Sequence, residues 1–228
     1  MKYFAIICGG GIGSRMGEAI PKQFLLLHGT PIIMHTIRHF QGLVDTIFIT
    51  LPKQHFPYWE ELQQKYDFHI PHTLIEGGNT RFESVRNAAS HLPNEGLVAI
   101  HDAVRPFVTP FLIKRCFKHA MRYGNAVTAV PVRDSLRVKV ETETKAVNRA
   151  DYSAMQTPQV FPCQRIKKAY QQAYNPCFTD DATVVESLGD KIEVVYGAQE
   201  NLKITTTDDL LMADYIFTKK YKDNESGF

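Results

Sequence analysis

A glycine-rich segment directly follows the first apolar run of the chain. Residues 9–16 have the sequence GGGIGSRM and come after the apolar residues 4–8. Glycine lets backbone N–H groups approach a phosphate closely, and a neighbouring cation neutralises the phosphate charge. A dinucleotide-binding fingerprint would need glycine at Ser14 or Met16, and a Walker loop would need Gly-Lys-Ser/Thr. The segment therefore predicts a phosphate-binding loop of another kind, in which Arg15 supplies the positive charge.

Three further charged positions are candidates for the same chemistry. Lys22 follows Pro21, whose ring fixes the local backbone and could aim the ammonium at the phosphate loop. Asp102 follows an apolar run, where a carboxylate is well placed to hold Mg²⁺ or a sugar hydroxyl, with Arg105 beside it. Lys203 stands in an apolar, strand-like segment, and an inward lysine needs an anion or a carboxylate partner. Each position also has an ordinary interpretation, as a solvated lysine, a turn-forming aspartate or a lysine on an exposed edge.

Other common kinds of site are not indicated. His35 and His39 are separated by Thr-Ile-Arg, without the glutamate of a zincin helix, and no G-x-S-x-G elbow occurs. The four cysteines form no C-x-x-C pair, so reduced thiols are expected. The 228 residues carry 26 Lys and Arg against 24 Asp and Glu, a balance that calls for neither nucleic acid nor a membrane surface. No stretch approaches the length of a membrane span, and we expect a cytoplasmic protein.

Alternating strands and helices must position these residues. Apolar, β-branched runs predict strands at 4–8, 46–50, 73–75, 97–100 and 126–130. Helices are predicted after Thr30-Pro31, over 58–66, after the capping-box sequence at 80–83, and from Thr109-Pro110 to about 123. This order predicts an α/β fold, with a mostly parallel sheet covered by helices on both faces. Ligands of such folds bind beyond the carboxyl ends of the strands, which points to residues 9–16, 77–79 and 102–106.

The pattern changes after Pro131. Residues 132–149 are polar and alternate in hydropathy around a turn-like 141–144, which predicts a hairpin outside the core. Because an isolated hairpin is marginally stable in water, we expect it to pack on something. Helices at 165–174 and 180–188, a strand at 192–196 and a closing helix at 208–219, capped by Thr206 or Thr207, complete one domain spanning 1–228. Residues 221–228 are expected to fray.

Taken in order, these segments resemble the methylerythritol phosphate cytidylyltransferases of the non-mevalonate isoprenoid pathway. The similarity covers nearly the whole chain, and the ordered set is far more specific than any one motif. The segments that carry it are 11–16, 21–23, 77–78 with Ser84, 101–106, 132–135, 156–159, 179–182 and 201–205.

The resemblance implies a glycosyltransferase-A-like nucleotidyltransferase fold, CTP and a small polyol phosphate as substrates, and Mg²⁺ or another divalent cation. It also implies a homodimer, in which a hairpin arm, matched here by 132–161, reaches toward the partner's active site. By residue, it implies catalytic roles for Arg15, Lys22, Arg149 and Lys203. It implies nucleotide binding by Gly9, Gly10, Gly11, Gly13, Gly78, Asn79, Ser84 and Asp102, with Asp102 also as the metal ligand. It implies binding of the sugar phosphate by Asp102, Arg105, Ser135, Arg149, Thr157, Thr179 and Lys203.

Two alternatives stay open at this point. Cys8-Gly9-Gly10 stands where the family usually has Pro-Ala-Ala, and Ser135 where it commonly has Thr. A Gly-Gly start is familiar from the related ribitol-phosphate cytidylyltransferases, whereas Arg149 and residues 179–182 look more like the isoprenoid branch. The second alternative is a nucleotide-binding regulator without catalysis, although a binder would need fewer charges than this chain retains.

Overall fold

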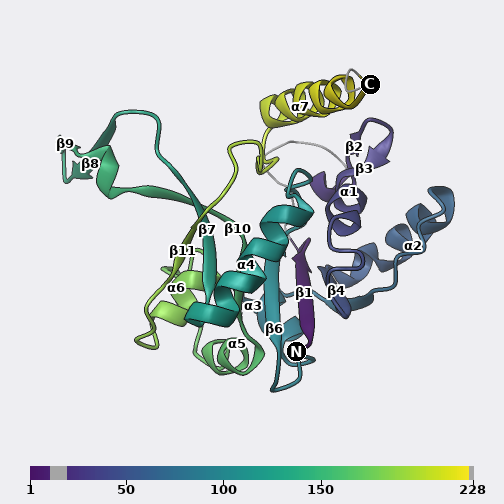
Figure 1. Cartoon of the computed structure of the whole chain (residues 1–228), viewed down its shortest axis with the longest axis horizontal. Helices are drawn as coiled ribbons and strands as arrows, with labels where there is room; N and C mark the ends of the chain where they lie inside the picture. The colour runs from purple at the N-terminus through teal and green to yellow at the C-terminus, as the bar shows by residue number, and fades with distance from the viewer. Residues whose placement is uncertain (11–19, 226–228) are drawn as a thin grey trace.

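The computed structural model describes residues 1–10 and 20–225, and within them the core is a seven-stranded sheet of order β11-β7-β10-β6-β1-β4-β5 (Figure 1). Its strands are β1 Tyr3–Cys8, β4 Thr46–Leu51, β5 Thr73–Glu76, β6 Leu97–Asp102, β7 Ala126–Pro131, β10 Ser153–Pro162 and β11 Val194–Tyr196. Neighbouring strands are parallel except β10, which runs antiparallel to both β6 and β7. The predicted mostly parallel sheet is therefore confirmed.

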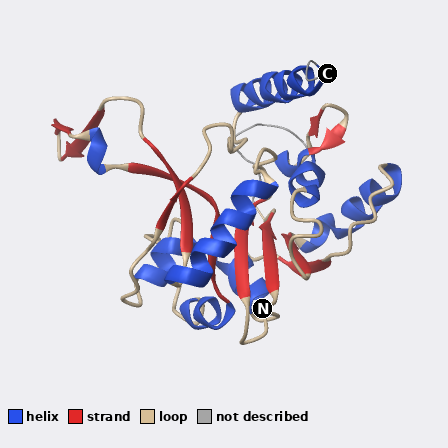
Figure 2. Cartoon of the chain, in the orientation of Figure 1, coloured by secondary structure: helices blue, strands red, loops and turns tan. Residues whose placement is uncertain are grey.

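Helices cover both faces of this sheet, also as predicted (Figure 2). One face packs against α1 Ile32–Arg38, α2 Phe56–Lys65 and α4 Pro110–Tyr123, through a core that includes Ile37, Trp59 and Phe117. The other face packs against α3 Arg81–Ala89, α5 Cys163–Ala169 and α6 Asp181–Glu186, through a core that includes Phe82, Ile166 and Val185. The interior strands β1 and β6 are apolar on both faces, because each is sandwiched between these two helical layers.

The register of the central strands brings their carboxyl ends to one edge. Cys8 at the end of β1 lies opposite Thr50 of β4 on one side and Asp102 of β6 on the other. The Gly9 N–H continues this pairing by donating to the carbonyl oxygen of Thr50 at 2.9 Å, and the Ala103 N–H donates to that of Cys8 at 3.0 Å. The loops after β1 and β6 therefore leave the sheet side by side.

Several local signals in the sequence are confirmed at the helix ends. Thr80 and Glu83 form a complete capping box at the start of α3. Thr109 caps α4, with Pro110 as its first residue. Thr206 and Asp209 exchange side-chain hydrogen bonds at the start of α7 Thr207–Glu225.

The expected cap at Thr30 is wrong. Thr30–Pro31 is the short strand β3, which pairs with β2 Leu26–Leu27, and α1 begins one residue later with Pro31 as N-cap. The Ile32 N–H donates to the carbonyl oxygen of Leu25, so the segment bends back as a small hairpin before the helix starts.

The hairpin outside the core is confirmed, but its predicted extent is wrong at the carboxyl end. β8 Leu136–Val140 and β9 Glu143–Val147 form a two-stranded sheet that projects from the body (Figure 1). Within the segment 132–161, however, β10 returns to the centre of the main sheet, where Gln159 pairs with Ile100 and Phe161 with Val98. The arm is therefore residues 132–152, and the rest of the segment is core.

Smaller elements and the carboxyl-terminal region complete the fold. Short 3₁₀ turns lie at Lys22–Phe24, Lys53–His55 and Arg149–Asp151. The strand-like segment 201–205 forms no strand, and α7 continues to Glu225. In the described part of the chain, no helix is both long and apolar enough to cross a bilayer.

Candidate active site

Two cavities open at the carboxyl edge of the sheet, and they share one wall. The larger has a volume of about 380 Å³ and is lined by residues that follow β1, β5 and β6. The smaller has a volume of about 230 Å³ and is lined by residues of β10 and of the start of α6. Arg81, Asp102 and Lys203 line both cavities. Two charged cavities therefore meet at these three side chains, at the edge of the parallel sheet where ligands of such folds bind.

Asp102 is the centre of the shared wall. Its carboxylate lies 3.0 Å from Nζ of Lys203 and accepts hydrogen bonds from Nε of Arg105 at 3.2 Å and Nε of Arg81 at 3.3 Å. Burial alone would raise the pKa of this carboxyl, but the attraction of Arg81, Lys203 and Arg105 outweighs burial and holds the pKa well below its ordinary value. Asp102 is therefore ionised at all physiological pH values, and the carboxylate partner expected for Lys203 is confirmed.

Arg81 is held from the other side by a second carboxylate. Its two terminal nitrogens donate to both oxygens of Asp181 at 2.9 and 2.7 Å. Asp181 is fully buried and also accepts a hydrogen bond of 2.5 Å from the hydroxyl of Tyr170. Burial would lower the pKa of Arg81, but the attraction of Asp181 and Asp102 raises it above its ordinary value. The guanidinium is thus permanently charged and fixed in the wall between the cavities.

Backbone groups and a lysine line the larger cavity. Gly9, Gly10, Lys22 and Asn79 all contribute to it. Gln23 is buried and donates from Nε2 to the carbonyl oxygen of Gly9 at 2.7 Å, which ties the Lys22 turn to the end of β1. A methyl group on Gly10 would lie 2.6 Å from Oγ of Ser84, so a larger residue at this position would require that hydroxyl to move.

Two hydrogen bonds join Gly78, Ser84 and Thr80 at the start of α3. The Gly78 N–H donates to Oγ of Ser84 at 3.1 Å, and that hydroxyl donates to the carbonyl oxygen of Thr80 at 2.9 Å. Ser84 lines the larger cavity, but Gly78 does not. The Gly78 N–H is therefore already used to shape the loop.

The smaller cavity is built on hydrogen bonds between β6 and β10. Oγ1 of Thr157 accepts from the Asp102 N–H at 3.1 Å and lies 3.0 Å from Nδ1 of His101. Gln159 donates to the carboxylate of Asp180 at 2.8 Å and so fixes the loop that carries Thr179. Thr157, Thr179 and Arg105 all line this cavity.

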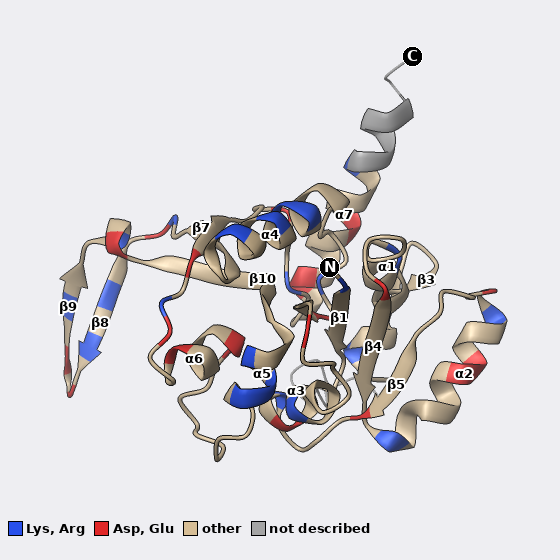
Figure 3. Ribbon diagram, turned by 60° about the horizontal axis from the view of Figure 1, so that its bottom comes forward, with Lys and Arg blue, Asp and Glu red and all other residues tan. Residues whose placement is uncertain are grey.

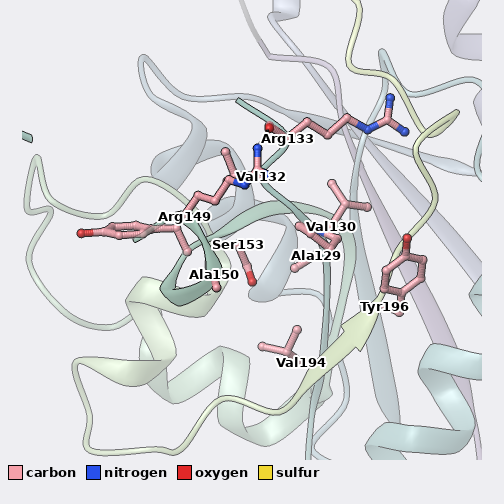
Figure 4. A pocket seen from close by; sticks show the side chains of 11 residues that line it. Ala129, Val130, Val132, Arg133, Arg149, Ala150, Ser153, Val194 and Tyr196 are labelled. Carbon is pink, nitrogen blue, oxygen red and sulfur yellow. Dashed lines mark hydrogen bonds between the residues drawn. The ribbon is translucent and has the colours of Figure 1, made fainter. Parts of the chain in front are cut away.

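Arg149 and Ser135 are not brought to either cavity of their own chain. Arg149 lies at the base of the arm, donates to the carbonyl oxygen of Arg133, and lines a separate groove of about 620 Å³ (Figure 4). In that view Arg149 and Tyr196 lie on opposite sides of the groove. Ser135 is exposed on the arm. Gly11, Gly13 and Arg15 lie outside the described residues.

The sequence analysis missed three residues of the site. Arg81 directly follows the cap residue Thr80, and its signal was an arginine placed after a strand end and two glycines. Asp181 follows Asp180, and one aspartate is enough to cap α6. The signal for Asp181 was therefore a second, adjacent aspartate that the cap does not need. Gln23 lies in the segment 21–23 that carries the family resemblance, but it was given no role of its own.

The donor set is compatible with a divalent cation held jointly with a substrate. Among the described residues no group of three or more His, Cys, Asp and Glu side chains could hold a metal ion. Mg²⁺, however, is commonly bound by one or two carboxylates together with substrate phosphates. Asp102 lines both cavities and supplies one such carboxylate. Figure 3 shows that acidic and basic residues are interspersed along the elements of the described chain.

Comparisons with known proteins agree with this geometry. A family model described as 2-C-methyl-D-erythritol 4-phosphate cytidylyltransferase (IspD) matches residues 3–219. The protein of that name from Porphyromonas gingivalis is 44% identical over 218 residues, which cover 95% of this chain and 98% of that protein. The protein of that name from Bacillus thuringiensis is 40% identical over 218 residues, which cover 93% of this chain and 96% of that protein.

Solved structures lead to the same family. The 4-diphosphocytidyl-2C-methyl-D-erythritol synthase of Anaerococcus prevotii superposes with a TM-score of 0.81 at 25% identity, covering 95% of this chain and 96% of that one. The cytidylyltransferase of Thermus thermophilus gives a TM-score of 0.78 at 26% identity, with 96% and 100% covered. The resemblance inferred from the motifs is confirmed, and this chain belongs to the 2-C-methyl-D-erythritol 4-phosphate cytidylyltransferase family.

Proposed function

We propose that this chain transfers the cytidylyl group of CTP to 2-C-methyl-D-erythritol 4-phosphate and releases pyrophosphate. The observation that carries the proposal is the wall of Arg81, Asp102 and Lys203 between two cavities. Two unequal polar cavities separated by fixed charges suit a reaction that brings a nucleoside triphosphate and a smaller phosphate together. The larger cavity takes CTP, and the smaller takes the sugar phosphate.

In the proposed reaction, a phosphate oxygen of the sugar phosphate attacks the α-phosphorus of CTP. The new P–O bond forms as the bond from the α-phosphorus to its bridge oxygen breaks, and that oxygen leaves with pyrophosphate. Because both reactants are anions, catalysis consists mainly of positioning and charge neutralisation. Lys22 binds the triphosphate, and Lys203 and Arg105 bind the sugar phosphate. Family resemblance also assigns Arg15 to the triphosphate.

Asp102 holds the divalent cation or the sugar hydroxyls in this proposal. A divalent cation, when bound, neutralises charge on the triphosphate. Asp102 is assigned this role because its carboxylate is ionised and lines both cavities. Mg²⁺ is the expected ion, since it is usually bound by one or two carboxylates with substrate phosphates.

The cytosine ring is read by backbone groups near Gly9, Gly10 and Asn79, with Ser84 as a side-chain helper. Polar groups matched to one base are left unpaired by another, which discriminates strongly. We therefore expect CTP to be used far better than UTP.

A homodimer formed through the arm is part of the proposal. A free two-stranded hairpin is marginal in water, and this arm exposes Val138, Val140 and Tyr152. A second copy of the chain would cover these side chains and would receive Arg149 and Ser135 at its own smaller cavity. A cytosolic location is likewise proposed, and its support is that all four cysteines are unpaired thiols, as is usual in a reducing compartment.

The test is pyrophosphate release from CTP with purified protein and Mg²⁺. Turnover is expected with 2-C-methyl-D-erythritol 4-phosphate, with little from UTP and little with ribitol 5-phosphate as the acceptor. Preferred use of ribitol 5-phosphate would assign the chain to the related activity instead. CTP binding without pyrophosphate release from either acceptor would identify a nucleotide-binding regulator.

A further inference from the structure

We infer that Asp181 is a positioning residue that fixes Arg81 between the two cavities and thereby couples the binding of the two substrates. The inference rests on the proposed function for the identity of those substrates. It concerns two side chains that lie on different segments of the chain and meet at the shared wall.

Arg81 uses its guanidinium in two directions at once. Nε donates to Asp102 at 3.3 Å, while the two terminal nitrogens donate to Asp181 at 2.9 and 2.7 Å. A bidentate pair of this kind fixes the plane of the guanidinium as well as its position. The side chain is 27% exposed, so one part of it faces the cavities while the rest is locked. Arg81 can therefore contact a phosphate without rearranging.

Asp181 has no other task that would require a buried charge. Asp180, not Asp181, accepts the N–H of Thr183 at 2.9 Å and caps α6. A fully buried carboxylate is costly unless a cation and hydrogen bonds compensate it. Arg81 supplies the cation, and the Tyr170 hydroxyl supplies a further hydrogen bond at 2.5 Å. The placement of Asp181 is thus explained by what it does to Arg81.

The pair also joins the two loops that form the two sites. Arg81 opens α3, next to the loop of Asn79 that lines the larger cavity, and Asp181 opens α6, next to Thr179 in the smaller. The neighbour of Arg81, Phe82, packs on Tyr170 with ring centroids 4.8 Å apart. A shift of either loop therefore moves the other. A ligand that orders one loop should lower the cost of ordering the other, which is positive coupling between the sites.

The test uses Arg81→Lys as its main variant. A lysine keeps the positive charge, but a single ammonium cannot contact Asp102 and hold Asp181 through two bonds at once. Asp181→Asn removes the carboxylate charge at nearly constant size, and Asp181→Glu restores it. Asp190→Asn is the matched control, because Asp190 pairs with Arg165 and lines neither cavity.

Two readouts separate positioning from simple structural support. The first is kcat per folded protein, and we expect Arg81→Lys and Asp181→Asn to lower it at least tenfold, equal to about 1.4 kcal/mol. We expect Asp181→Glu to recover part of that loss and Asp190→Asn to stay within twofold of wild type. The second is calorimetric binding of the α,β-methylene analogue of CTP, whose bridge does not break, with and without the sugar phosphate. The analogue should bind at least threefold more tightly to wild type when the sugar phosphate is present, and the two affinities should become equal in Arg81→Lys.

Wild-type kcat and unchanged coupling in Arg81→Lys would overturn the inference, as would equal analogue affinities in the wild type. Loss of activity in Asp181→Asn that matches its loss of folded protein would also count against it. If Asp181→Asn does not fold, the kcat and the analogue binding of Arg81→Lys decide whether the inference holds. Failure of the proposed function looks different, because then the wild type releases no pyrophosphate at all, whatever the binding data show.

Discussion

Thr157 donates its hydroxyl proton to Nδ1 of His101 across 3.0 Å. The direction follows from the other ring nitrogen, because Nε2 faces the carbonyl oxygen of Arg105 at 3.2 Å and a carbonyl can only accept. Burial lowers the pKa of His101 to about 3, so the ring is neutral and Nδ1 is its acceptor. The same Thr157 oxygen accepts the Asp102 N–H. The backbone that carries the central carboxylate is therefore fixed by an uncharged chain of hydrogen bonds.

These hydrogen bonds predict that Thr157→Val strongly lowers the stability of the protein. Valine keeps the shape but leaves the Asp102 N–H and Nδ1 of His101 without partners, each costing roughly 1–3 kcal/mol when buried. We expect the free energy of unfolding in urea to fall by about 2–6 kcal/mol, with Thr157→Ser, which keeps the hydroxyl, close to wild type. Equal stability of the two variants would contradict the hydrogen-bond assignment.

His101 predicts a specific dependence of stability on pH. Its pKa falls from the ordinary 6.5 to about 3 on folding, so between these values the unfolded chain binds a proton that the folded chain does not. Stability is therefore complete above pH 6.5 and decreases as the pH falls, by about 1.4 kcal/mol per pH unit for one proton. Urea unfolding at pH 7, 6 and 5 should show this slope. His101→Gln should have a flatter slope by that amount, and parallel slopes would refute the prediction.

Gly78→Ala should disrupt the loop that leads into α3. A methyl group at this position would lie 2.2 Å from Cβ of Glu83, whose carboxylate completes the capping box on Thr80. Overpacking of this kind costs roughly 1–3 kcal/mol. We expect a loss of stability in that range together with weaker CTP binding in calorimetry. A variant with wild-type stability and affinity would show that the loop tolerates the added atom.

Lys22→Ala should lower kcat/KM with CTP far more than it lowers stability. By analogy with the loss of one oxyanion donor, we expect a decrease of about 3–4 kcal/mol in transition-state stabilisation. The control is Lys53→Ala, because Lys53 is exposed and its pair with Glu76, at 3.7 Å, lies on the surface. Similar kinetics for the two variants would remove Lys22 from the proposed machinery.

Mixed dimers test whether Arg149 serves the partner's site. Arg149→Ala and Lys22→Ala proteins, each nearly inactive, are unfolded together and reassembled. If Arg149 acts across the interface, each mixed dimer has one intact site, and random pairing restores about a quarter of wild-type activity. If Arg149 acts within its own chain, every site carries one lesion and no activity returns. Reassembly is checked by the mass of the particle in light scattering.

The sequence predicted what depends on short-range pattern. The apolar runs of β1 and β4 and the capping box at Thr80 are local signals, and each was sufficient to define its element. Gly9, Gly10 and Asp102 could be predicted to line a cavity because they stand at the ends of strands, and Lys22 because it follows Pro21. Lys203 was recognisable because a lysine in an apolar segment needs a partner.

The elements that were missed depend on long-range pairing. β10 could not be recognised because its residues become a strand only through pairing with β6 and β7 on either side. Asp181 could not be assigned because its partner, Arg81, lies 100 residues earlier in the chain. The Thr30 cap failed because a turn joining β2 to β3 outweighed a local preference.

The order of the strands has a consequence for the folding of the protein during its synthesis on the ribosome. The strands β1, β4, β5 and β6 come first in the sequence and lie together, so this half can pair as soon as it is synthesised. The contacts that complete the site join residues separated by 56, 96 and 100 positions, and they form only after β10 and the segment of Lys203 have emerged. Contacts this distant form slowly. We therefore expect catalytic competence to appear last during synthesis, after the amino-terminal half of the sheet is already ordered.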